Sequence, residues 1–67
     1  MPSEAEIKRI FDAAWAGIER RDITAAVKER GHLARVLTGA HSSDHEIEYR
    51  AICDAIISLR HKTPVRR

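Results

Sequence analysis

The sequence predicts an all-α protein: a small antiparallel bundle of two or three helices, a helical hairpin with a bend near residue 22. Helix-forming residue types dominate the chain, and no stretch alternates strictly between apolar and polar residues. Apolar residues instead recur at helical spacing in three stretches. With 67 residues and one cysteine, the chain has a small core and no internal disulfide. We therefore expect a homodimer, because a second copy would supply the stability that a core of this size lacks.

The first expected helix follows Ser3, which is a favoured N-cap residue. Glu6 stands three positions later and completes a capping-box pattern. The expected core stripe and its flanks consist of Ile7, Ile10, Phe11, Ala14, Trp15 and Ile18. This spacing predicts one apolar face that packs against a second helix.

A second helix is expected to begin after Asp22. The apolar stripe changes phase between Ile18 and Ile23, so one straight helix would carry two apolar faces. Asp22 is a good N-cap and favours a bend there. The second stripe consists of Ile23, Ala26, Val27, Leu33, Ala34 and Leu37. Gly31 lies off this stripe, and the sequence leaves open whether it kinks the helix.

The third expected helix is preceded by a loop. Gly39 suits the left-handed position that ends a helix, and Ser43 with Glu46 forms a second capping box. The main apolar face consists of Tyr49, Ile52, Ala55, Ile56 and Leu59, widened by Ile47, Cys53 and Ile57. Because proline stops a helix at Pro64, we expect one domain over residues 1–62 and a flexible basic tail at 63–67.

Two histidines four residues apart, His41 and His45, raise the question of a metal site. The predicted cap at Ser43 separates them, and two imidazoles leave zinc short of ligands. We therefore expect neither metal nor cofactor. Cys53 falls mid-helix among apolar residues, where nothing lowers its pKa for nucleophilic chemistry. No catalytic motif is present, so we expect a protein that is not an enzyme.

Residues 20–35 carry a local positive charge. Five basic residues (Arg20, Arg21, Lys28, Arg30 and Arg35) stand against Asp22 and Glu29. A helix-turn-helix centred on Gly31 would have to bury Arg30 and His32 in its turn, so a solvated helix face is the preferred interpretation. The alternative is a transcriptional regulator that binds nucleic acid through this stretch and the C-terminal tail.

Binding to another protein is the function that the sequence favours. The chain has the build of a small stand-alone interaction module that modulates or inhibits a partner protein. Accessory regulators, antitoxins and phage- or plasmid-encoded inhibitors of host factors share this size and class. The interface residues that we expect are Trp15, Tyr49, Ile52, Ile56 and Leu59. The last four have the 3-4-3 spacing of a helix-packing seam and would form the dimer contact.

The apolar runs are too short to span a membrane. The N-terminal stretch has no basic region followed by an apolar one, as a signal peptide would. We therefore expect a cytoplasmic protein with no membrane contact.

Overall fold

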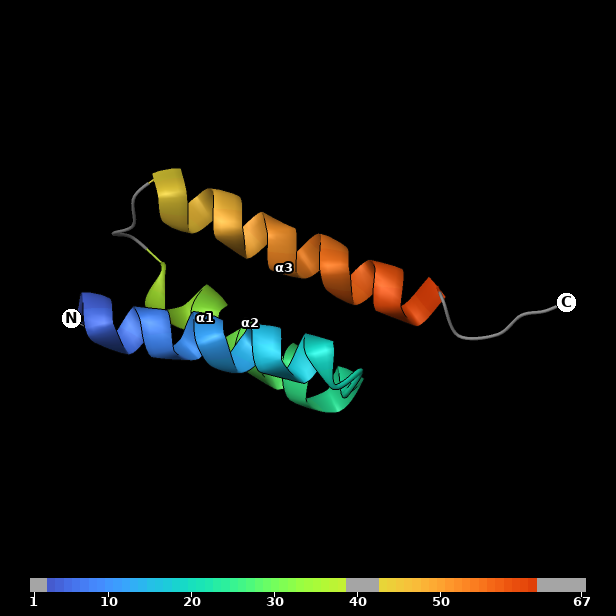
Figure 1. Cartoon of the computed structure of the whole chain (residues 1–67). Coiled ribbons are helices and arrows are strands. Elements are labelled where there is room, and N and C mark those ends of the chain that lie inside the picture. The colour runs from blue at the N-terminus through green and yellow to red at the C-terminus, as the bar shows by residue number, and fades with distance from the viewer. Residues whose placement is uncertain (1–2, 39–42, 62–67) are drawn as a thin grey trace, which may run out of the picture.

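The computed structural model describes residues 3–38 and 43–61, and these form three helices packed together, with no strand (Figure 1). The helices are α1 (Glu4–Glu19), α2 (Ile23–Val36) and α3 (Ser43–His61). The all-α prediction is confirmed for these residues. The expected loop glycine Gly39 and the expected tail at 63–67 lie outside them.

The predicted start of α1 is confirmed. Ser3 has an extended backbone, with φ −79° and ψ 165°, and its Oγ accepts a hydrogen bond from the backbone N–H of Glu6 at 3.2 Å. This bond satisfies one of the amide groups that have no partner within the first helical turn. Glu4 and Glu6 also place negative charge at the positive end of the helix dipole.

The chain reverses between α1 and α2 through two consecutive capping motifs. The N–H of Asp22 donates to the carbonyl of Gly17 at 2.8 Å, and that of Arg21 donates to the carbonyl of Ile18 at 3.0 Å. This is a Schellman motif, with Arg21 in the left-handed region at φ 59°. The side chain of Asp22 then accepts from the N–H of Ala25 at 3.1 Å. The predicted bend and the predicted N-cap at Asp22 are therefore both confirmed.

Small residues bring α1 and α2 together, and this pair of helices makes the most extensive packing in the fold. Gly17 is buried, and a Cβ atom there would lie 3.1 Å from the backbone nitrogen of Ala26. Ala14 and Ala26 are themselves fully buried. The two helix backbones therefore approach closely because nothing larger than a methyl group stands between them at these positions.

The core lies where α3 packs over the α1–α2 pair. It consists of Ile7, Phe11, Ala14, Ala26, Leu33, Leu37, Ile52 and Ile56. Leu33, Ile52 and Ile56 are the largest fully buried side chains, and they come from α2 and α3. The buried residues of α3 thus belong to the core of the single chain.

Gly31 does not interrupt α2, which runs as one helix from Ile23 to Val36. A helix-turn-helix motif centred on this glycine is therefore wrong. Ala26 and Leu33, on either side of Gly31, are both fully buried, and their packing favours a helix that continues through it. Gly31 itself is exposed, and a Cβ atom there would meet nothing within 4 Å.

The N-cap role predicted for Ser43 is not found in the structure. The structure places Ser43 inside α3 as its first residue, so Ser43 is not the flanking N-cap. The residues that precede Ser43, from 39 to 42, lie outside the described residues. The sequence has serine at both 42 and 43, so residue type alone does not choose between them.

Candidate protein-docking site

The five predicted interface residues do not share one surface. Ile52 and Ile56 are buried in the core of the single chain, so they are not open to a partner. This corrects the role predicted for them: both α1 and α2 pack beneath α3 and cover this stripe. Trp15, Tyr49 and Leu59 are half-buried and stay partly accessible.

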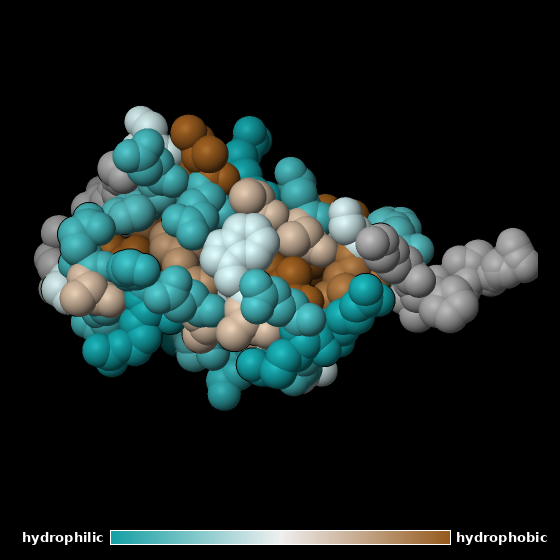
Figure 2. Space-filling model, in the orientation of Figure 1, coloured by the Kyte–Doolittle hydropathy of each residue, from teal (hydrophilic) through white to brown (hydrophobic). Residues whose placement is uncertain are grey.

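A hollow opens between α1 and the second half of α3. It has a volume of about 320 Å³ and is lined by Ile18, Glu19, Arg21, Ala55, Ser58 and Leu59. Figure 2 shows apolar surface between hydrophilic rims in the region where α3 lies over α1. The apolar residues of the hollow are half-buried, and the charged ones are exposed at its edge. We call this hollow the α1–α3 groove, and we consider Trp15 with it because Trp15 precedes Ile18 by about one helical turn on α1.

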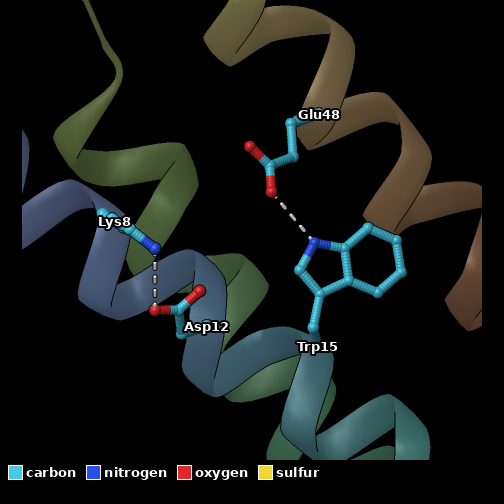
Figure 3. A network of polar contacts seen from close by, with 4 residues as sticks. All are labelled: Lys8, Asp12, Trp15 and Glu48. Atoms are coloured by element: carbon cyan, nitrogen blue, oxygen red, sulfur yellow. Dashed lines mark hydrogen bonds and ion pairs between the residues drawn. The ribbon is translucent and has the colours of Figure 1, made fainter.

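Trp15 is held in a fixed orientation by α3. Its indole Nε1 donates a hydrogen bond to a carboxylate oxygen of Glu48 at 3.0 Å (Figure 3). This bond joins residues 33 positions apart and satisfies the polar end of a half-buried ring. The nearby pair of Lys8 and Asp12 is exposed and separated by 3.4 Å, so it contributes little stability.

His45 forms a second polar contact between α1 and α3. Its Nε2 lies 3.1 Å from a carboxylate oxygen of Glu4, and its ring centroid is 6.1 Å from that of Phe11. Within residues 3–38 and 43–61, no group of three or more His, Cys, Asp or Glu side chains could hold a metal ion. His41 lies outside the described residues, so the absence of a metal stays a prediction.

A second hollow lies on the other side of α3, toward α2. It has a volume of about 330 Å³ and is lined by Ala34, Leu37, Thr38, Glu46 and Tyr49. Burial raises the pKa of the Tyr49 hydroxyl above its usual value, and interaction with Cys53 raises it further. The positive charge of Arg30 acts in the opposite direction.

We expect Tyr49 to ionise at a higher pH than free tyrosine, which titrates near 10.0. Because the pKa of Tyr49 is raised in the folded state, the hydroxyl ionises at a lower pH in the unfolded chain than in the folded one. The contribution of the neutral Tyr49 hydroxyl to the free energy of unfolding is therefore complete below pH 10 and is lost as pH rises through the folded-state pKa. The chain has one tyrosine, so absorbance near 295 nm reports it directly. Tyr49→Phe should remove this absorbance signal and lessen the loss of stability at alkaline pH. A titration midpoint of Tyr49 at or below the usual value for tyrosine would contradict the prediction.

The five basic residues predicted for nucleic-acid contacts are divided among separate places. Lys28 and Arg35 are exposed and seven residues apart, and so share the outer face of α2. Arg30 is half-buried and close enough to Tyr49 to affect its pKa. Arg20 and Arg21 lie at the reversal between α1 and α2. Arg30 therefore lies on a different side of α2 from Lys28 and Arg35.

Comparison with family models, curated proteins and solved structures finds no match to this chain. Within the described part of the chain, no helix is both long and apolar enough to cross a membrane.

The α1–α3 groove includes a residue whose role was not evident from the sequence. Ile18 belongs to the predicted core stripe, but it stands at the end of α1, where that stripe reaches solvent.

Proposed function

We propose that the protein is a small interaction module that binds an apolar segment of a partner protein in the α1–α3 groove. The observation that carries this proposal is the hollow lined by half-buried Ile18, Ala55 and Leu59, with charged Glu19 and Arg21 exposed at its rim. An apolar centre within a polar rim is typical of protein interfaces. By binding there, the module would modulate or inhibit its partner.

The fixed indole supports this assignment. Tryptophan is enriched among the residues that contribute most to binding energy. The hydrogen bond from Trp15 to Glu48 already restricts the ring, so less side-chain entropy is lost when a partner binds. Leu59 and Ile18 add apolar area that is partly open. Trp15 and Leu59 are also two of the interface residues predicted from the sequence.

The second candidate function is nucleic-acid binding, and it is favoured by the pair of exposed basic residues on α2. Lys28 and Arg35 would contact phosphates from the outer face of that helix. Such binding depends strongly on released counterions and weakens steeply as salt rises. Salt dependence therefore separates the two candidates.

The test is affinity capture from native-host lysate with wild type, Leu59→Gln and Arg35→Gln. We expect the wild type and Arg35→Gln to retain the same protein through a high-salt wash, and Leu59→Gln to lose it. Both substituted positions are at least partly exposed, so circular dichroism should show unchanged helicity. Arg35→Gln is the matched control because it lies away from the groove.

Two results contradict the proposal. In one, the wild type retains no protein that is lost with Leu59→Gln. In the other, the retained material is nucleic acid that salt releases and that Arg35→Gln fails to bind. The second result supports the nucleic-acid function instead.

A further inference from the structure

The outer face of α3, which points away from the other helices, exposes two large apolar side chains. Ile47 is 66% exposed and Ile57 is 52% exposed, and they are the exposed large hydrophobic residues of the described chain. In Figure 1 α3 lies along one edge of the molecule, with α1 and α2 on one side of it. Figure 2 shows apolar atoms among hydrophilic ones along this edge.

These two isoleucines belong to a regular pattern on α3. The residues at alternating spacings of four and three are Ser43, Ile47, Arg50, Asp54, Ile57 and His61. This is the heptad spacing of a helix-packing seam. The seam is distinct from the core stripe, since Ile52 and Ile56 lie on the opposite side of the helix. We call it the outer seam.

The outer seam is complementary to itself when it is read in reverse. Its residue numbers are symmetric about position 52, so Ile47 corresponds to Ile57 and Arg50 corresponds to Asp54. In an antiparallel pair of identical helices, a seam residue faces the residue at the symmetric position of the other helix. Each isoleucine would then face an isoleucine, and each charge would face its opposite.

We propose that a second copy of this chain docks on the outer seam, with the two α3 helices antiparallel about a two-fold axis near residue 52. Ile47 packs against the partner's Ile57, and Arg50 pairs with the partner's Asp54. The symmetry repeats both contacts on the other side of the axis. The central charged layers are therefore flanked by one apolar layer at each end.

The charged pair at the centre sets the direction of the two helices. Within the described residues, neither Arg50 nor Asp54 has an ion-pair partner, although they stand four positions apart on one helix. A parallel arrangement in register would place Arg50 against the partner's Arg50 and Asp54 against the partner's Asp54. Like charges would then repel, so only the antiparallel arrangement satisfies both residues.

This self-association is independent of the proposed function. The outer seam and the α1–α3 groove lie on different sides of α3, because Ala55 and Leu59 line the groove and neither residue belongs to the seam. A dimer can therefore form whether or not a partner protein binds, and the two tests can fail separately.

The test exchanges the two charges. Sedimentation of the full chain over a range of concentrations should show a reversible dimer for wild type. Arg50→Asp alone and Asp54→Arg alone should each weaken it at least about tenfold, because two attractive pairs become two repulsive ones. The double variant R50D/D54R should dimerise again. An equimolar mixture of the two single variants should form a heterodimer, because every facing pair in it is opposite in charge.

Ile57→Asp tests the apolar contact between the two chains and should also weaken the dimer. Circular dichroism should show wild-type helicity for every variant, since all these positions are exposed. A wild type that stays monomeric at all concentrations overturns the proposal. So does a dimer whose strength the single charge reversals leave unchanged, or a mixture that fails to associate.

Discussion

Ile56→Asp is expected to unfold the chain. Ile56 is 2% exposed and lies in the core among residues of all three helices. An aspartate there would be a buried charge without a partner, which costs several kcal/mol, about as much as the ~3–5 kcal/mol that a core of this size supplies. Circular dichroism should show loss of helicity and of a cooperative melting transition at neutral pH.

Ile57→Asp is the matched control, because it makes the same change one residue further along the same helix. Ile57 is 52% exposed, so the new carboxylate stays in water. We expect its free energy of unfolding to lie within about 0.5 kcal/mol of wild type at concentrations where the chain is monomeric. A wild-type melting curve for Ile56→Asp would show that this side chain is not buried in the single chain.

The helices and the bend between the first two could be predicted because the signals are local. Ser3 and Asp22 bond to amides three residues ahead, so residue type and spacing identify both caps. Gly31 was ambiguous because one glycine costs a helix only about 1 kcal/mol relative to alanine. Packing of Ala26 and Leu33 on either side decides the outcome, and that packing is not local in sequence.

The candidate sites were harder to predict because periodicity shows that a face is apolar but not what covers it. Ile52 and Ile56 have the spacing of a dimer seam, yet two helices of the same chain bury them. The contact of Trp15 with Glu48 and that of His45 with Glu4 join residues 33 and 41 positions apart. Neither pair has a local sequence signature, since tertiary packing alone brings these side chains together.

Substitution by leucine should lower the free energy of unfolding at Gly17 in α1 and raise it at Gly31 in α2. At Gly17 even a Cβ atom would lie 3.1 Å from the nitrogen and 3.4 Å from the Cα of Ala26, both backbone atoms. The carbonyl of Gly17 also accepts the hydrogen bond that closes the reversal at Asp22. Gly17→Leu should therefore force α1 and α2 apart, at a cost of about 3 kcal/mol or more. Chemical denaturation monitored by circular dichroism measures this loss.

Gly31→Leu is the control, since both variants gain the same helix propensity. Nothing lies within 4 Å of the position of a Cβ atom at Gly31, so the new side chain projects into water. Leucine restricts the unfolded chain more than glycine does, and the substitution should stabilise the fold by about 0.5–1 kcal/mol. If both variants were stabilised alike, the close approach of α1 to α2 at Gly17 would be wrong. If Gly31→Leu were instead destabilised as strongly as Gly17→Leu, α2 would not be a continuous solvent-exposed helix at that point.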